Sequence, residues 1–121
     1  MPEIAFTVAK HLIGEDIPHN DLKAIIDDAI NFSAPIVKLE ENVYVLELFH
    51  GPSLAFKDFG ARFMSRVMGY FLEDGEKQLD VLVATSGDTG GAVAVEDGLR
   101  FLGRVAFAAL GLGEALVERG L

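Results

Sequence analysis

Apolar residues recur at helical spacing in three stretches of the chain. The first covers residues 3–13 and ends near Gly14, the second follows Asn20, a candidate N-cap, and the third begins around residues 58–61. The apolar residues of the second and third stretches are Leu22, Ile25, Ile26, Ala29 and Ile30, followed by Phe63, Met64, Val67, Met68 and Phe71. We therefore expect three amphipathic helices, each burying one face.

Three shorter segments have the composition of strands. Residues 36–39 and 43–49 are extended in character, and the polar residues between them predict the turn of a β-hairpin. Residues 79–84 form an apolar run of the length expected for a buried parallel strand, placed between the third helix and a further helical segment. The pattern predicts an α/β fold made of a hairpin and a helix-strand-helix unit.

The end of the chain is apolar and rich in glycine. A glycine in a helix interior costs about 1 kcal/mol relative to alanine, which weakens a helical pattern. The glycines of this segment are Gly98, Gly103, Gly111, Gly113 and Gly120. We interpret residues 95–121 as a helical tail that is separate from the pattern of residues 1–94.

Composition narrows the classes of function. The chain has 121 residues, 50% of them hydrophobic, which is enough for one modest core. Its formal net charge is -9, so it offers no electrostatic basis for binding nucleic acid. It has no cysteine and no clustered histidines, and we expect neither disulfide, thiolate nor metal chemistry.

The sequence also predicts the compartment. The amino end lacks a basic segment followed by an apolar run, which is the pattern of a cleaved signal. Arg104 and Glu114 interrupt the apolar tail, whereas a span needs about 20 mostly apolar residues. We therefore expect a cytoplasmic protein that does not cross a membrane.

Lys57 stands out because residues 47–60 around it follow neither a helical nor a strand pattern. A lysine amine becomes a better nucleophile where burial or nearby positive charge favours its neutral form, and a helix amino end carries partial positive charge. Lys57 precedes a predicted helix, and Phe56 and Phe59 are placed to exclude water from it. Asp58 is a candidate cap of that helix. The alternative is an ordinary surface lysine in a loop.

A second candidate site is the turn at residues 85–91, which follows the predicted strand and opens a helix. A helix amino end carries unpaired backbone N–H groups, and glycines let an anion approach them closely. Ser86 and Thr89 add hydroxyl donors, and ligands of open α/β sheets bind beyond the carboxyl ends of the strands. We expect a carboxylate or phosphate here, although an ordinary strand-to-helix turn remains the alternative.

The two segments together resemble threonine synthase. The first, residues 46–64, reads LELFHGPSLAFKDFGARFM, and the second, residues 84–90, reads ATSGDTG. Two long motifs in this order and at this spacing are much more specific than one short signature. The likeness runs from about Pro2 to Ala94, and it implies a fragment of a fold-type II pyridoxal-phosphate enzyme domain.

The resemblance implies a reaction and roles for individual residues. Threonine synthases use pyridoxal phosphate to convert O-phosphohomoserine, a small amino-acid phosphate, and water to threonine and phosphate. Lys57 would form the internal aldimine and later move protons, and Phe56 and Asp88 would contact the cofactor. The residues that would hold the substrate α-carboxylate are Ser86, Gly87, Asp88 and Thr89.

The chain departs from the family in three respects. Members of the family are several times longer, and their later glycine-rich loop for the cofactor phosphate has no match here. After Ala94 the sequence no longer follows the family, and Ser53 stands where threonine is usual. We therefore expect a truncated threonine synthase with a tail of unknown relationship. The alternatives are a related enzyme such as a serine or threonine dehydratase, and a non-catalytic module for binding or self-association.

Overall fold

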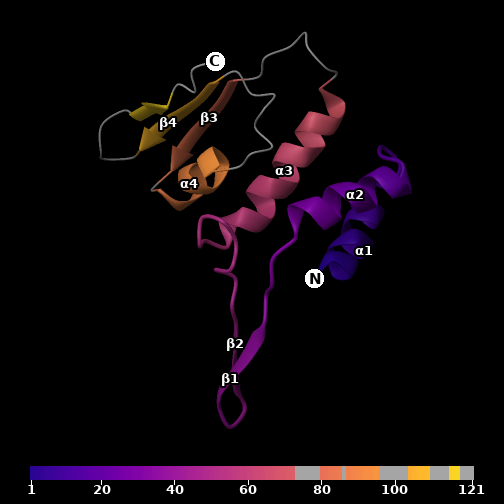
Figure 1. The fold of residues 1–121 in the computed structure, drawn as a ribbon, viewed down its shortest axis with the longest axis vertical. Helices are drawn as coiled ribbons and strands as arrows, with labels where there is room; N and C mark the ends of the chain where they lie inside the picture. The colour runs from indigo at the N-terminus through magenta and orange to yellow at the C-terminus, as the bar shows by residue number, and fades with distance from the viewer. Residues whose placement is uncertain (73–79, 86, 96–103, 110–114, 118–121) are drawn as a thin grey trace.

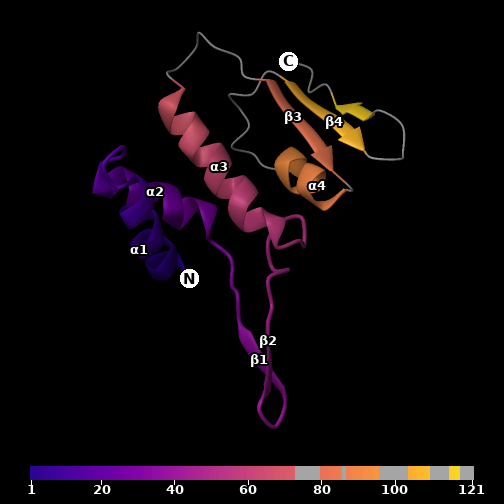
Figure 2. The ribbon, with the colours of Figure 1, turned by 180° about the vertical axis from the view of Figure 1, so that it is seen from behind.

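The structure is a computed structural model that describes residues 1–72, 80–85, 87–95, 104–109 and 115–117 (Figure 1). Its elements in chain order are α1 (Pro2–Ile13), α2 (His19–Ala29), β1 (Ile36–Glu40), β2 (Val43–Leu46), α3 (Lys57–Phe71), β3 (Asp80–Thr85), α4 (Asp88–Val95), β4 (Arg104–Ala109) and β5 (Ala115–Val117). Helix α3 lies between two groups of elements, with α1 and α2 on one side and α4 and the β3-β4-β5 sheet on the other (Figures 1 and 2).

Helices α1, α2 and α3 enclose the main core. Its buried residues are Ala9, Ile17, Leu22, Ile25, Ile26, Ala29 and Ile30. Phe59, Phe63 and Val67 of α3 pack against them. The helical spacing of the first three stretches is thus confirmed. The prediction of Asn20 as the N-cap is wrong, because α2 already begins at His19 and its N-cap is Pro18.

Arg62 of α3 joins the core to the carboxyl end of α2. Its Nε donates to the carbonyl oxygen of Ala29 at 2.7 Å, and its Nη2 donates to that of Asp28 at 3.0 Å. The last carbonyl groups of a helix have no partner within the helix and carry partial negative charge. A guanidinium supplies hydrogen-bond donors for these groups and a positive charge that offsets theirs. The Arg62 guanidinium carbon also lies 5.8 Å from the centre of the Phe32 ring. A buried cation thus ties α3 to α2.

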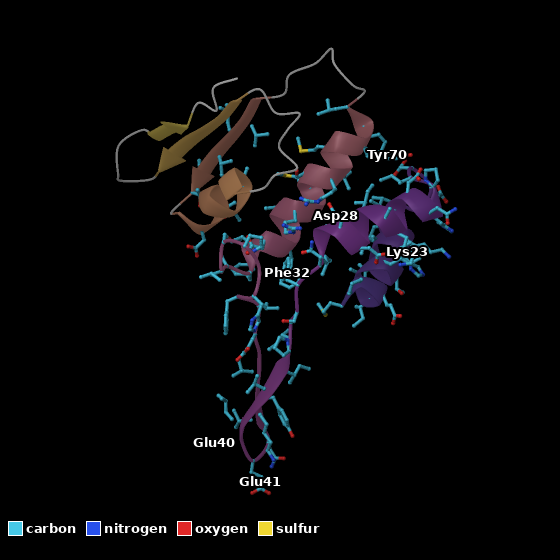
Figure 3. The ribbon with its side chains drawn as sticks, viewed as in Figure 1. Lys23, Asp28, Phe32, Glu40, Glu41 and Tyr70 are labelled. Carbon is cyan, nitrogen blue, oxygen red and sulfur yellow. The ribbon has the colours of Figure 1, made fainter. Side chains whose placement is uncertain are left out.

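Two further polar contacts cross between these helices on the surface. Arg66 Nε donates to the Asp28 carboxylate at 2.7 Å, and the Tyr70 hydroxyl donates to the Asp21 carboxylate at 3.2 Å. Figure 3 shows Asp28 and Tyr70 along the boundary between α2 and α3. Burial raises the pKa of the Tyr70 hydroxyl above its ordinary value, and the hydrogen bond and negative charge of Asp21 raise it further.

The predicted β-hairpin is confirmed, although its second strand ends at Leu46 and not at residue 49 as predicted. β1 and β2 pair antiparallel, and the turn between them includes Asn42 with a φ of 62°. Asparagine tolerates this left-handed conformation better than most residues. The hairpin extends away from the helices, with Glu40 and Glu41 at its tip (Figure 3), and every residue of both strands is exposed.

The second group of elements is a small sheet covered on one face. β3 pairs parallel with β4, and β4 pairs antiparallel with β5. The cluster between α3, α4 and β3 consists of Ala61, Met64, Val81, Val83, Ala92 and Val93. The parallel strand is as predicted, but its burial on both faces is wrong: Leu82 points away from this cluster and is 80% exposed.

The prediction of a helical tail is wrong where the structure describes it. Residues 104–109 and 115–117 are strands β4 and β5, while residues 96–103, 110–114 and 118–121 lie outside the described residues. The backbone of β4 is paired residue by residue with β3, a tertiary contact that overrides local helix preference. Within the described residues, no helix is long and apolar enough to cross a membrane.

Candidate functional site

Lys57 is the first residue of α3, which begins one residue before the predicted range of 58–61. Phe56 before it is the N-cap and already has helical angles, φ -60° and ψ -16°. The preceding segment is a series of turns, in which the Leu54 N–H donates to the carbonyl oxygen of Gly51 and the Asp58 N–H to that of Ala55, both at 3.1 Å. Lys57 therefore lies where a loop of tight turns enters the amino end of a long helix.

The Lys57 amine rests on an aromatic ring. Its Nζ lies 4.3 Å from the centre of the Phe56 ring, which is a cation–π distance, and Phe56 is 55% exposed. Among the described residues, Lys57 takes part in no ion pair. Phe59 does not flank the amine as predicted, because its ring packs against Phe32 with 4.7 Å between centres. One aromatic ring, not two, thus shields Lys57.

Asp58 turns inward and does not cap α3. The residue is 2% exposed, and no side chain makes a cap hydrogen bond at the start of this helix. Its carboxylate accepts two hydrogen bonds from Ser53, one from the backbone N–H at 2.9 Å and one from the hydroxyl at 2.5 Å. The sequence predictions missed this pairing. The signal available was a turn-forming Gly51-Pro52-Ser53 run followed five residues later by an aspartate.

The turn before α4 has the geometry of a helix amino end. Gly87 has a φ of 142°, which glycine alone adopts readily, and its carbonyl oxygen accepts the first hydrogen bond of α4, from the Gly91 N–H at 2.8 Å. The Gly87 N–H donates to the Thr85 hydroxyl at 3.3 Å. Asp88 is exposed and Thr89 half-buried in the first helical turn, while Ser86 lies outside the described residues.

The two candidate segments lie at the same end of the molecule. α3 and α4 contact each other, and both begin at the end where β3 points (Figure 1). Lys57 is the first residue of α3 and Asp88 that of α4, so both open helices that contact each other, and α4 begins beyond the carboxyl end of β3. The backbone N–H groups of the first turn of α4 have no partner within the helix, so an anion can bind there.

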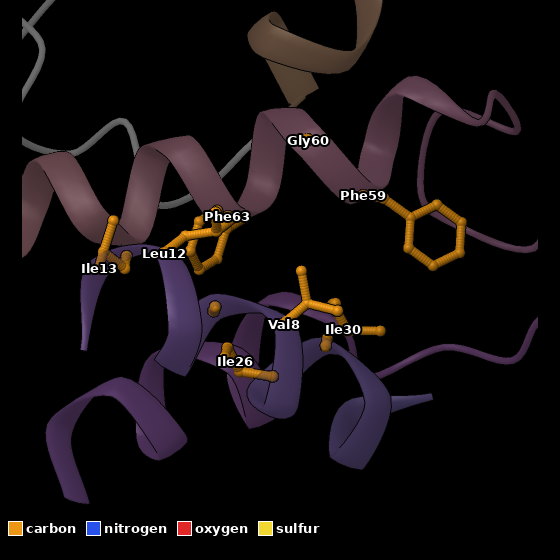
Figure 4. Close-up of a pocket in the computed structure, with 10 residues that line it drawn as sticks. Val8, Leu12, Ile13, Ile26, Ile30, Phe59, Gly60 and Phe63 are labelled. Carbon is orange, nitrogen blue, oxygen red and sulfur yellow. The ribbon is translucent and has the colours of Figure 1, made fainter. Parts of the chain in front are cut away.

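A separate cavity of about 400 Å³ lies between α1, α2 and α3 (Figure 4). The residues that line it are all apolar: Ala5, Val8, Ala9, Leu12, Ile13, Ile26, Ile30, Phe59, Gly60 and Phe63. It opens on the face of α3 opposite to α4 and holds no titratable side chain. The cavity is therefore no part of the candidate site. Among the described residues, no group of three His, Asp or Glu side chains is arranged to bind a metal ion.

The chain matches no protein-family model, but it is similar to curated proteins. It is 53% identical over 83 residues to the threonine synthase of Haemophilus influenzae and 50% identical over 82 residues to that of Escherichia coli. These alignments cover 69% and 68% of this chain, and the chain spans only 19% of the length of each relative.

Solved structures give the same relationship. The crystal structure of threonine synthase from Escherichia coli superposes with a TM-score of 0.75 at 42% identity, covering 84% of this chain and 23% of that one. A structure described as PLP-bound threonine synthase from Brucella melitensis superposes with a TM-score of 0.69 at 34% identity, covering 88% of this chain and 24% of that one. Over its N-terminal part, the chain is thus similar to a segment of the threonine synthases.

Proposed function

We propose that this chain carries the cofactor-binding lysine and the carboxylate-binding turn of a pyridoxal-phosphate-dependent threonine synthase, a cytoplasmic enzyme that converts O-phosphohomoserine and water to threonine and phosphate. The observation that carries the proposal is the position of Lys57 at the amino end of α3, a helix that contacts α4, in a chain 53% identical over 83 residues to a threonine synthase. We assign full turnover to the longer enzyme, since this chain spans 19% of that relative.

The residues present fit the cofactor at the lysine. The Lys57 amine is not engaged in an ion pair among the described residues, and it lies over the Phe56 ring. A weakly held, half-buried amine is available to attach to a carbonyl compound. The Phe56 ring keeps water from one side of the amine and offers an apolar surface to a flat aromatic ligand.

Each residue then has a distinct part in the reaction. Pyridoxal phosphate, when bound, supplies an electron sink that stabilises carbanions of the amino-acid substrate. Lys57 would hold the cofactor through Nζ and would move protons at that same nitrogen. The backbone N–H groups of Asp88 and Thr89 hold and orient the substrate α-carboxylate. Gly87 permits the close approach, since no atom lies within 4 Å of the place where a side chain would begin.

Ser86 and the side chain of Asp88 complete the proposed site. Ser86 lies outside the described residues, and by the sequence resemblance it would add a hydroxyl donor to the substrate carboxylate. The Asp88 side chain is negatively charged and cannot itself attract a carboxylate, so we assign it to the cofactor. Its negative charge is favourable in the first turn of a helix, where the backbone is partly positive.

The test is covalent trapping of the cofactor on the purified chain. We expect that pyridoxal phosphate gives a visible absorbance band and that borohydride reduction fixes the label on Lys57, as mapped by mass spectrometry. The band and the label are lost in Lys57→Ala and kept in Lys38→Ala, which changes an exposed lysine of the hairpin. Equal labelling of Lys38 and Lys57 in the unaltered chain contradicts the proposal.

A related enzyme using the same lysine and turn, such as a serine or threonine dehydratase, is the alternative within this cofactor group. The relatives found are named threonine synthases, which favours O-phosphohomoserine as the substrate. A substrate screen decides, run on the chain supplied with pyridoxal phosphate and not reduced with borohydride. Release of phosphate from O-phosphohomoserine supports threonine synthase chemistry, and ammonia from serine or threonine supports a dehydratase.

A non-catalytic role as a self-association module has one observation in its favour. The hairpin exposes apolar residues along both strands, among them Ile36, Leu39, Tyr44 and Leu46. Exposed apolar surface of this kind is typical of interaction sites. Light scattering over a range of concentrations tests the idea, and a chain that stays monomeric throughout excludes it.

A further inference from the structure

Asp58 is buried directly against the loop that leads to Lys57. It is 2% exposed, and both of its carboxylate oxygens are used: Oδ2 accepts from the Ser53 N–H at 2.9 Å and Oδ1 from the Ser53 hydroxyl at 2.5 Å. A buried carboxylate is tolerated only where hydrogen bonds replace the water it has lost. Ser53 supplies both of these bonds, so the two residues form one unit.

Gly51 forms the wall behind this unit. A β-carbon built on Gly51 would lie 2.3 Å from Asp58 Oδ2 and 2.7 Å from Asp58 Cβ. Any side chain at this position would push Asp58 out of its place. Gly51, Ser53 and Asp58 thus make a close-fitted group, which we call the Asp58 cluster.

The Asp58 cluster closes a ring of backbone that contains Lys57. The two hydrogen bonds join residues 53 and 58, and the segment between them includes Leu54, whose φ of 59° is a strained conformation for leucine. Such a conformation persists where surrounding contacts hold it. The ring therefore depends on the hydrogen bonds between Ser53 and Asp58. The conformation of the backbone on either side of Phe56 depends on them as well.

The direction of the Lys57 side chain follows from the direction of Asp58. Successive side chains of an α-helix leave its axis about 100° apart, because the helix has about 3.6 residues per turn. With Asp58 fixed inward at the start of α3, Lys57 is held to the side, where its amine meets the Phe56 ring at 4.3 Å. If Asp58 were released, the first turn of α3 could unwind and the amine would lose its orientation.

We propose that Asp58 is a positioning residue for the lysine chemistry, acting through Ser53 to fix the loop and the first turn of α3 and so to aim the Lys57 amine. This inference rests on the proposed function for Lys57 as the cofactor-binding residue. Asp58 itself touches neither substrate nor cofactor in this role. Its carboxylate acts on the backbone, and the backbone orients Lys57.

The first experiment needs no cofactor. The Lys57 Nζ lies 4.3 Å from the centre of the Phe56 ring, so we expect the NMR signals of the adjoining ε-methylene protons to be shifted upfield. In Asp58→Asn an amide NH₂ replaces one of the two carboxylate oxygens, so the remaining oxygen can accept from only one of the two Ser53 donors, and we expect the shift to collapse toward that of an exposed lysine. Ser53→Ala removes the hydroxyl bond and gives a partial loss. Ser53→Thr keeps the hydroxyl and retains the shift.

The second experiment measures cofactor labelling in the same variants. We expect the ratio of Lys57 label to Lys38 label to fall by between about tenfold and 100-fold in Asp58→Asn, as for a misplaced reacting group. In Ser53→Thr, which keeps the hydroxyl, the ratio should stay that of the unaltered chain. Ile25→Val is the control for lost stability, since Ile25 lies in the main core and belongs neither to the Asp58 cluster nor to the proposed site. It should lower the unfolding midpoint and leave both readings of Lys57 unchanged.

The outcomes separate the two levels of the argument. If Asp58→Asn lowers the unfolding midpoint but keeps the Lys57 shift and the label ratio, Asp58 is merely structural and the inference is overturned. If the unaltered chain labels Lys57 no more than Lys38, the proposed function fails, and the NMR comparison still decides whether Asp58 aims the amine.

Discussion

Replacing Arg62 by methionine tests the tie between α3 and α2. Methionine fills much of the volume of the arginine stem but donates no hydrogen bond, so Arg62→Met leaves the carbonyl groups of Asp28 and Ala29 without their donor. Both bonds are short, at 3.0 Å and 2.7 Å, and Arg62 is only 7% exposed, so water cannot replace the guanidinium without opening the helix pair.

The magnitude follows from the two bonds. A hydrogen bond from a charged donor contributes about 1.5–3 kcal/mol, so losing two of them costs about 3–5 kcal/mol once partial relaxation of the helix end is allowed. Stable domains have a free energy of unfolding of about 5–15 kcal/mol, so this loss is a large fraction of the total. Arg62→Lys keeps the charge but not the planar fork, and we expect about half the loss.

The assay is equilibrium unfolding in urea, followed by far-UV circular dichroism. The control is Lys23→Met, which removes an ion pair of 2.6 Å to Asp27 between side chains that are 61% and 48% exposed. Such a pair contributes only about 0.3–0.5 kcal/mol. The reasoning is refuted if the free energy of unfolding of Arg62→Met lies within about 1 kcal/mol of that of the unaltered chain. The hydrogen bonds to α2 would then not stabilise the fold.

Three further predictions concern the same helices. Leu22→Ala should lower the free energy of unfolding in urea by about 2–5 kcal/mol, because Leu22 is 0% exposed, whereas Leu12→Ala at 76% exposure should change it by less than about 0.5 kcal/mol; equal effects would contradict the assigned core. Gly60→Ala should raise the thermal midpoint, because a β-carbon at this position meets no atom within 4 Å. The expected gain in the free energy of unfolding is about 0.4–1 kcal/mol. A lower midpoint would show a clash that the structure lacks. Because burial and Asp21 raise the pKa of Tyr70, the advantage of the unaltered chain over Tyr70→Phe is present below the unfolded tyrosine value of about 10 and is lost as the pH rises through the higher folded value. Urea midpoints measured from pH 8 to about pH 12 check this, and a difference independent of pH would argue against it.

Local patterns were enough to predict most elements. The apolar spacing of Leu22, Ile26 and Ala29 defines a helix face by itself, and the same holds for the hairpin, whose turn at Asn42 lies between two segments of strand composition. The start of α2 was predicted two residues late, with Asn20 in place of Pro18 as the N-cap. Asn20 is a good capping residue by type, but Pro18 provides the entry angle and leaves Asn20 inside the helix.

The error in the tail has a different origin. Residues 104–109 become a strand because they meet residues 80–85, more than twenty positions earlier, and hydrogen-bond to them in parallel register. No local pattern encodes such a pairing. A parallel partner also needs a crossover connection, which α4 provides between β3 and β4. Residue preferences within the tail carry no information about this contact.

The candidate site was only partly predictable for the same reason. The place of Lys57 at a helix start and of Gly87 in a turn follows from neighbouring residues. The bond from Ser53 to Asp58 depends on how a loop of tight turns closes, which residue types alone leave open between a cap and an inward carboxylate. The packing of Phe59 against Phe32, in place of Lys57, likewise depends on the tertiary fold.

Strand β3 is an edge strand of the small sheet as far as the structure describes it. Within the described part of the sheet, β3 pairs with β4 alone, and Leu82 on its outer face is 80% exposed. An edge strand with unpaired backbone groups and an apolar side chain can accept a strand from another sheet. Association of the chain should therefore depend on protein concentration, because the sheets of two chains can pair edge to edge through β3 in concentrated solution. The substitution Leu82→Lys would place a charge on this edge strand and disfavour such association.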